Sequence, residues 1–183
     1  MLTSLAGCGE TSPASPEATA SDASPTPSEP DTTDPSDSSE PGDPAAPLPE
    51  SLDFIATTVE GDRFEGASLA GKPALLWFWA PWCPTCRSQV PQVESLAGEY
   101  AGEVAVVGVG SLDSAEAIAA FAAEVEGVTP LEDVDGALYR KFGIAEQSSF
   151  VLLDDDGEVA FETGYGGSDD LADEVADVAQ SAG

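Results

Sequence analysis

The sequence predicts an α/β fold in which a central mixed β-sheet is flanked by helices on both faces. Two unbroken apolar runs, at 74–79 and 104–109, are typical of strands buried on both faces, and a helical pattern separates them. A pair of short strands between residues 150 and 161 encloses a strong turn signal. A strand–helix–strand core followed by an antiparallel hairpin gives a sheet that contains both parallel and antiparallel strands.

The first elements of the folded region are strands around one helix. Residues 54–64 alternate weakly between apolar and polar types around Glu60-Gly61-Asp62, which predicts an N-terminal β-hairpin. Residues 74–79 read ALLWFW and form the first core strand. From residue 83 to about 100, apolar residues recur at helical spacing. These apolar residues are Val90, Val93, Leu96 and Ala97.

Two further helices are expected between the second core strand and the second hairpin. Asp113 or Ser114 can cap an extra helix that runs to about residue 126 with its apolar residues on one face. Asp135 is predicted to cap a short helix that contains residues 138–142. The extra helix therefore directly follows the second core strand.

The C-terminal elements are a hairpin and a closing helix. Strands at 150–153 and 159–161 flank Asp155-Asp156-Gly157, a sequence typical of a tight turn between two strands. We interpret the acidic residues of this turn as turn formers rather than as calcium ligands. The last helix is expected to run from residue 168 or 169 to about 182.

The composition divides the chain into a folded domain at 51–183 and a long N-terminal tail. Residues 9–50 contain ten Pro and ten Asp or Glu, with no Lys, Arg or aromatic residue. Such a segment buries too little apolar surface to offset its ordering entropy, so we expect a disordered, acidic, Pro/Ser-rich tether. Residues 51–183 hold every Trp, Tyr and Phe, which is enough for one compact domain.

The charge balance excludes several classes of function. The chain has 35 acidic residues, five basic residues and no histidine. A negative field of that size repels phosphate backbones and anionic headgroups, so nucleic-acid binding is excluded and contact with a membrane requires another means. The absence of histidine removes imidazole acid–base chemistry and the commonest transition-metal ligand.

The N-terminus carries an attachment signal. Leu5-Ala6-Gly7-Cys8 resembles the lipobox of bacterial lipoproteins, in which the cysteine is lipidated and becomes the mature N-terminus. The resemblance implies that residues 1–8 are the remnant of a lipoprotein signal. It also implies a domain anchored to the outer face of the cell membrane by its acyl chains, or otherwise secreted. The alternative is an incidental cysteine in the tail.

The other two cysteines lie at a strand-to-helix junction, in WFWAPWCPTCRSQVP at 77–91. Cys83 precedes the predicted helix, and Pro84 suits its first turn because a proline needs no hydrogen-bond acceptor there. Free amides and the helix dipole favour a thiolate on Cys83, and Cys86 lies one turn further on the same face. We expect Cys83 to be the exposed attacking thiol, Cys86 the shielded resolving thiol, and Arg87 a nearby positive charge.

The pair allows three interpretations. A zinc site requires about four ligands, whereas only Cys83 and Cys86 are available together. A purely structural disulfide across so few residues constrains the unfolded chain little. A catalytic redox pair fits the strand–CxxC–helix context and is the interpretation that we favour. It requires neither a cofactor nor a metal.

The residues around the pair resemble the extracytoplasmic TlpA/DsbE-like redoxins of the thioredoxin fold. Their pattern W-A-x-W-C-x-x-C-[KR]-x-x-x-P is matched by Trp79, Ala80, Trp82, Cys83, Cys86, Arg87 and Pro91. The resemblance extends over about 54–182 and implies a thioredoxin-like fold and thiol:disulfide exchange. It implies exported proteins with cysteines or disulfides as substrates, and a membrane redox partner.

The sequence departs from this family in the loop 144–150. The family places a cis-proline at the position of Ser148, and because a cis bond before serine is costly, we predict a trans bond. We expect Gln147, Ser148 and Ser149 to offer backbone or hydroxyl contacts to a bound substrate strand. The alternative is an ordinary polar turn.

A second departure concerns the buried carboxylate that relatives place near the pair. The two corresponding positions hold Trp77 and Gln89, neither of which ionises. This favours an oxidase or a slow exchange protein over a strong reductase. Trp77, Phe78 and Trp79 are expected in the core. Trp82 is expected to be exposed and in contact with partners, with Pro84, Thr85 and Arg87 supporting the pair.

Two rival functions stay open from the sequence. The broader redoxin fold also serves thiol-dependent peroxidases, although their Pro-x-x-x-Thr-x-x-Cys pattern is absent because Thr85 directly precedes Cys86. A non-catalytic cell-surface lipoprotein that retains the fold around an inert disulfide is the other rival.

Overall fold

The computed structural model describes residues 47–182. The predicted signal remnant at 1–8, including Cys8, and nearly all of the predicted tether at 9–50 lie outside the described residues. Within residues 47–182, no helix is both long and apolar enough to cross a membrane.

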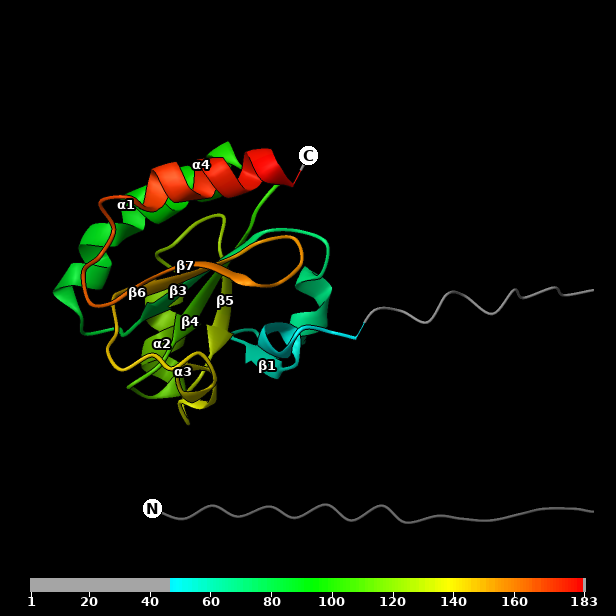
Figure 1. Cartoon of the computed structure of the whole chain (residues 1–183). Coiled ribbons are helices and arrows are strands. Elements are labelled where there is room, and N and C mark those ends of the chain that lie inside the picture. Colours follow the sequence, from blue (N-terminus) through cyan, green and yellow to red (C-terminus); the bar gives the residue numbers. More distant parts are fainter. Residues whose placement is uncertain (1–46, 183) are drawn as a thin grey trace, which may run out of the picture. The chain divides into compact units, whose positions relative to one another are not determined.

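Seven strands, four α-helices and two short 3-10 helices make up residues 47–182 (Figure 1). The strands are β1 (Ile55–Thr58), β2 (Arg63–Glu65), β3 (Ala74–Trp79), β4 (Ala105–Gly110), β5 (Thr129–Glu132), β6 (Ser149–Leu153) and β7 (Val159–Thr163). The helices are α1 (Pro84–Glu99), α2 (Ala115–Ala122), α3 (Ala137–Lys141) and α4 (Leu171–Ser181), with 3-10 helices η1 (Glu50–Leu52) and η2 (Gly66–Leu69).

The strands form one mixed sheet in the order β2-β1-β5-β4-β3-β6-β7. The central strand β3 is parallel to β4 and antiparallel to β6, and β4 is parallel to β5. Both predicted hairpins are present, β1 with β2 and β6 with β7. The predicted mixed sheet is therefore confirmed.

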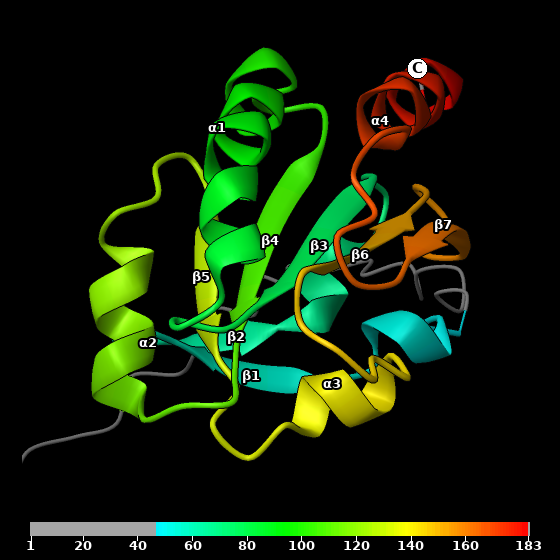
Figure 2. The same cartoon turned by 90° about the vertical axis from the view of Figure 1, so that its left-hand side faces the viewer.

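The two faces of β3 build two separate apolar layers. Trp77 and Trp79 point to the face covered by α1, α2 and α4, and Phe78 points to the face covered by α3 and the 3-10 helices. Figure 2 shows α1 and α4 together on one side of the sheet. All six residues of β3 are buried, so the prediction of a strand enclosed on both faces is confirmed.

One strand was missed by the sequence prediction. β5 reads TPLE, a four-residue segment with a proline, and it carries too little apolar periodicity to be recognised alone. Its strand conformation depends on pairing with β4 on one side and β1 on the other. Four of the seven strands thus lie on the β4 side of β3.

Two predicted helix boundaries were wrong. α2 begins after the predicted cap Ser114, whose hydroxyl accepts the Ala117 amide, but it ends at Ala122 rather than near residue 126. The N-cap residue of α3 is Gly136 and not Asp135, and Gly136 is left-handed. The side chain that caps the first turn is that of Asp133, whose carboxylate accepts the amides of Leu138 and Tyr139 at 3.1 Å.

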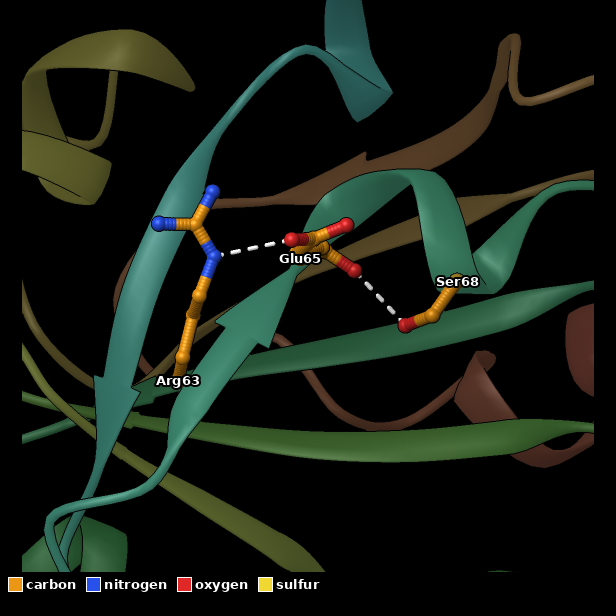
Figure 3. A network of polar contacts seen from close by, with 3 residues as sticks. All are labelled: Arg63, Glu65 and Ser68. Atoms are coloured by element: carbon orange, nitrogen blue, oxygen red, sulfur yellow. Dashed lines mark hydrogen bonds and ion pairs between the residues drawn. The ribbon is translucent and has the colours of Figure 1, made fainter. Parts of the chain in front are cut away.

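The outer edge of the N-terminal hairpin is charged. On β2, the Nε atom of Arg63 lies 2.8 Å from Oε1 of Glu65, and the Ser68 hydroxyl donates to the main-chain oxygen of Glu65 (Figure 3). Charged side chains on an exposed edge strand disfavour pairing with a second chain. This edge therefore ends the sheet instead of extending it.

The described chain begins by packing against the β6–β7 turn. Leu52 in η1 is buried, and the Ser51 hydroxyl donates to the main-chain oxygen of Gly157. Gly157 has a φ of 80°, and a side chain there would collide with Leu52 and Pro49. The turn therefore requires glycine both for its conformation and for this contact.

Candidate redox site

The cysteine pair lies at the start of α1, directly after the central strand. Cys83 is the N-cap residue, Pro84 occupies the first turn, and the Cys83 sulfur accepts the Cys86 amide at 3.2 Å. An N-cap side chain satisfies one of the free amides of a helix end, and here that side chain is the sulfur itself. The predicted helix-start geometry of the pair is confirmed.

Both cysteines are free thiols with no exposed surface in this structure. The expected exposure of Cys83 was therefore wrong. Its sulfur turns towards the helix end to accept the Cys86 amide, and there it joins the apolar cluster that contains Trp79 and Phe150. A partner sulfur reaches Cys83 only when side chains over the helix end move aside.

The Cys86 thiol lies in surroundings that oppose its ionisation. The pKa of Cys86 is raised to about 12, mainly by burial and also by hydrogen bonding and charge from Cys83. The main chain of Ala80 and the hydroxyl of Ser148 act in the opposite direction. The assignment of Cys86 as the shielded thiol agrees with this environment.

Trp82 projects from the turn that precedes Cys83. Its side chain is 55% exposed, as predicted, and its indole nitrogen donates to the main-chain oxygen of Leu112 at 3.1 Å. Leu112 is itself 49% exposed and has a φ of 64°. The two side chains place exposed apolar surface next to the redox pair, and no pattern in the sequence indicates Leu112.

Tyr165 is a second neighbour that sequence reasoning missed. Its hydroxyl lies 2.8 Å from the Thr85 hydroxyl, between the two cysteines in sequence, although the residues are 80 positions apart. The loop that carries it follows β7, where Gly and polar residues give no local pattern to read. Half of the Tyr165 side chain is exposed, so with Trp82 and Leu112 it frames the helix end.

Arg87 does not direct its charge at the cysteines. Its guanidinium pairs with Glu124 at 2.6 Å, lies 4.7 Å from the centre of the Phe121 ring and donates to the Pro81 main chain. The ion pair offsets the positive charge that was expected to act on Cys83. Arg87 instead joins the start of α1 to the end of α2.

The loop before β6 meets the pair from the other side. The Ser148 amide donates to Phe78 at 2.7 Å, and its main-chain oxygen accepts the Gly166 amide at 2.9 Å. Ser148 is fully buried with a φ of 65°. Neighbouring strands and loops bind both backbone groups in this state, and a contact of Ser148 with a substrate strand stays a prediction.

The two residues beside Ser148 differ in their accessibility. Ser149 is buried, its hydroxyl donates to the Glu146 main chain at 2.8 Å, and its contact with substrate stays a prediction. Gln147 is half-buried, and its contact with substrate stays a prediction. The loop is consequently an internal support of the site more than a presented strand.

The three residues that depart from the family pattern form one buried chain of hydrogen bonds. The Trp77 indole nitrogen donates to the Gln89 side-chain oxygen at 3.0 Å, and the Gln89 nitrogen lies 3.4 Å from the Ser148 main-chain oxygen. Every member is neutral. The two positions at which the family resemblance implied a carboxylate are thus occupied by an indole and an amide that bond to each other.

This arrangement suits dithiol–disulfide exchange. The Cys83 sulfur accepts an amide at the start of a helix, where free N–H groups favour negative charge, and the partner sulfur of Cys86 lies one turn away. Among residues 47–182, no group of three His, Cys, Asp or Glu side chains is placed to hold a metal ion.

The fold and the pair define a thioredoxin-like thiol:disulfide oxidoreductase. The chain belongs to the redoxin family, whose model, described as Redoxin, matches residues 40–180. It is 37% identical over 131 residues to the soluble secreted antigen MPT53 of Mycobacterium tuberculosis, a match that covers 69% of this chain and 75% of MPT53.

Solved structures agree with this assignment. MTB DsbF, determined in mixed oxidised and reduced forms, is 40% identical with a TM-score of 0.67, over 72% of this chain and 98% of DsbF. A secreted Mycobacterium tuberculosis disulfide oxidoreductase homologous to E. coli DsbE is 34% identical with a TM-score of 0.62, over 70% of this chain and 98% of that one. The predicted thioredoxin-like fold is confirmed.

Proposed function

We propose that the protein donates its Cys83–Cys86 disulfide to cysteine pairs of exported proteins outside the cytoplasm. The observation that carries this proposal is the Cys86 amide, 3.2 Å from the Cys83 sulfur at the start of α1. Stabilising the Cys83 thiolate stabilises the reduced form of the protein, which makes the disulfide more oxidising. The neutral network at Trp77 and Gln89 supports the same direction, since it holds no base to activate Cys86 as an attacking thiol.

The proposed reaction moves two electrons from substrate to protein. A substrate thiolate attacks the Cys83 sulfur, the Cys83–Cys86 bond breaks, and its electron pair leaves on Cys86. The second substrate thiolate then attacks the substrate sulfur of the mixed disulfide, and Cys83 leaves as a thiolate next to the Cys86 amide. The substrate loses two protons and two electrons, and the protein gains a dithiol. We propose that a membrane redox partner restores the disulfide.

Exposed side chains around the helix end are proposed to receive the substrate. Trp82, Leu112 and Tyr165 are each about half exposed, and a partner chain buries apolar surface against them. Gln147, at the start of the opposite loop, is proposed to contact the same substrate.

The proposed location is outside the cytoplasm, with a lipid anchor at Cys8. Two relatives are described as secreted, which supports export. Cys8 lies outside the described residues, so the anchor rests on the lipobox resemblance. Mass spectrometry of the membrane fraction tests it: we expect Cys8 to carry acyl chains, and an unmodified Cys8 on protein in the soluble fraction contradicts the anchor.

Disulfide transfer to a synthetic dithiol peptide tests the activity. The assay uses Cys8→Ser protein, in which Cys83 and Cys86 are the only cysteines. We expect stoichiometric peptide oxidation and no transfer by Cys83→Ser. We also expect a trapped mixed disulfide when reduced Cys86→Ser meets a peptide whose single cysteine is activated as a disulfide with a small thiol, because neither Cys86 nor a second peptide thiol is then present to release Cys83.

The reduction potential distinguishes the proposed direction from its rivals. A reduction potential of about −120 mV indicates an oxidase, and a potential of about −270 mV indicates a reductase. A value below about −300 mV, with no transfer to the peptide, indicates an inert structural disulfide and contradicts the proposal.

A further inference from the structure

Ser148 is the one buried side chain of the described residues whose polar atom has no hydrogen-bond partner. The other buried polar side chains all make hydrogen bonds. They are Gln89, Ser111, Asp133 and Ser149. Buried hydroxyls are normally paired, so an unpaired one next to a reactive pair requires an explanation.

The position of the Ser148 side chain is fixed by its backbone. Its φ of 65° lies in the left-handed region, which a serine rarely adopts. The conformation is held by the bonds of its amide to Phe78 and of its carbonyl to Gly166 and Gln89. The hydroxyl is therefore held in the interior and has little freedom to turn towards solvent.

Ser148 packs against the face of α1 that carries Cys86, because its main-chain oxygen accepts the side chain of Gln89, which is buried one helical turn after the equally buried Cys86. Its hydroxyl acts to lower the pKa of the Cys86 thiol, against the larger effect of burial. The Tyr139 hydroxyl, the other buried hydroxyl near the pair, already donates to the main chain of Trp79. In this structure, in which Cys86 is a free thiol and therefore a weak acceptor, the Ser148 hydroxyl makes no hydrogen bond.

We propose that the Ser148 hydroxyl donates a hydrogen bond to Cys86 whenever the Cys86 sulfur carries negative charge. This inference rests on the proposed exchange reaction. When a thiolate attacks Cys83 and the disulfide breaks, the electron pair leaves on the Cys86 sulfur, and the Ser148 O–H stabilises it until a proton arrives from solvent. In the reverse direction the same bond stabilises the Cys86 thiolate that attacks the mixed disulfide.

This role affects rates and leaves the equilibrium at neutral pH unchanged. Because the pKa of Cys86 is about 12, the reduced protein carries a protonated Cys86 at pH 7, and a donor to the thiolate does not change the energy of that state. The transition state does carry charge on the leaving sulfur. Losing the donor therefore slows exchange in both directions equally.

Two substitutions separate the hydroxyl from the backbone conformation. Ser148→Ala and Ser148→Gly both remove the donor, but alanine keeps the strained φ and glycine relieves it. The rate of disulfide reduction by dithiothreitol at pH 7 is followed by tryptophan fluorescence, since Trp77 and Trp79 lie in the same cluster as the pair. We expect both variants to react about tenfold more slowly, with the same equilibrium constant as the parent.

Ser111→Ala is the matched control. Ser111 is a buried serine whose hydroxyl donates to the Asp133 main chain, so its loss is expected to lower stability without changing the rate. Rates for both Ser148 variants within twofold of the parent overturn the proposal. A slow alanine variant with a normal glycine variant also overturns it, because that result assigns the effect to the backbone.

The test is independent of the natural substrate, because dithiothreitol is the attacking dithiol. The two proposals can therefore fail separately. If both Ser148 variants react slowly while the parent protein fails to oxidise the dithiol peptide, the role of the hydroxyl is supported and only the proposed function is contradicted.

Discussion

The cysteine pair is enclosed by two regions of the chain that are built in different ways. The helix side, residues 82–87, positions Cys83 and Cys86 through bonds between residues three apart in sequence. The loop side, residues 146–149 and 164–166, reaches the pair through contacts such as Gln89 with Ser148 and Thr85 with Tyr165, which are 59 and 80 positions apart.

The difference separates two tasks. The helix side determines which sulfur accepts a hydrogen bond from a main-chain amide. This is a local property, because any helix that starts at Cys83 has free amides there. The loop side decides how buried and how polar the surroundings of Cys86 are, and it does so with a left-handed serine and neutral side chains. Four variants test this division, from the largest expected effect to the smallest.

The largest expected effect is the loss of stability of the reduced protein at alkaline pH, where Cys86 ionises on unfolding. Burial favours the neutral thiol of Cys86 and raises its pKa from 9.0 to about 12. The contribution of the neutral thiol to the unfolding free energy is therefore complete below pH 9 and is lost as pH rises towards 12. Relative to Cys86→Ala, the reduced protein should lose at most about 1.4 kcal/mol of unfolding free energy per pH unit above pH 9. Urea unfolding at pH 8 to 11 measures this. The oxidised protein, whose disulfide cannot titrate, is the control, and parallel profiles for reduced parent and variant contradict the expectation.

Gln89→Leu should remove the buried hydrogen bonds that join Trp77 and the loop side to α1. It leaves the buried Trp77 indole nitrogen without an acceptor, which should lower the unfolding free energy by about 1–3 kcal/mol. Urea unfolding at pH 7 measures the loss. Gln180→Leu is the control, because the Gln180 amide bonds only within its own exposed helix turn. Equal losses in both variants would mean that the buried chain contributes nothing.

Trp82→Ala should affect substrate transfer and leave the fold nearly unchanged. The side chain is 55% exposed, so the unfolding free energy should change by less than about 1 kcal/mol. The kcat/KM for peptide oxidation should fall about fivefold, or about 1 kcal/mol, if a substrate buries this ring. Ile55→Ala, which removes an exposed side chain on β1, should change neither quantity. An unaltered kcat/KM for Trp82→Ala excludes the ring from substrate contact.

Arg87→Ala should have the smallest effect. Its pair with Glu124 is half exposed, and the contact with Phe121 adds a cation–π interaction, so the expected loss of stability is about 0.5–1 kcal/mol. Arg63→Ala removes a similarly exposed pair without an aromatic ring and should cost less. Thermal unfolding of both variants at low and high salt tests the ranking, and a larger loss for Arg63→Ala reverses it.

Local pattern made most of the fold predictable. The strand at 74–79, the helix after Cys83 and the two hairpins each carry their periodicity or turn residues within a few positions. β5 escaped because its pairing partners, and not its own four residues, make it a strand. The capping role of the Asp133 side chain in α3 was not predicted, because Asp133 is separated from the helix by a turn that contains Gly136.

The same rule applies to the site. Cys83, Cys86 and exposed Trp82 were predictable, since the helix side is local. Tyr165 and Leu112 were not, because each meets the pair only after distant segments fold together. The resemblance located Ser148 in the loop. Its positive φ and inward hydroxyl follow from bonds to Phe78, Gly166 and Gln89 that no local pattern encodes.

The packing of Leu52 against Gly157 determines where the described chain enters the domain. Gly157 lies in the β6–β7 turn beyond Leu153, which pairs with Ala74 at the start of β3, whereas Cys83 follows the other end of that strand. A six-residue strand separates its ends by about 17 Å. A protein captured on a solid support through a tag ahead of Pro49 is thus held by the pole opposite its cysteines, and the exposed side chains around the helix end face the solution.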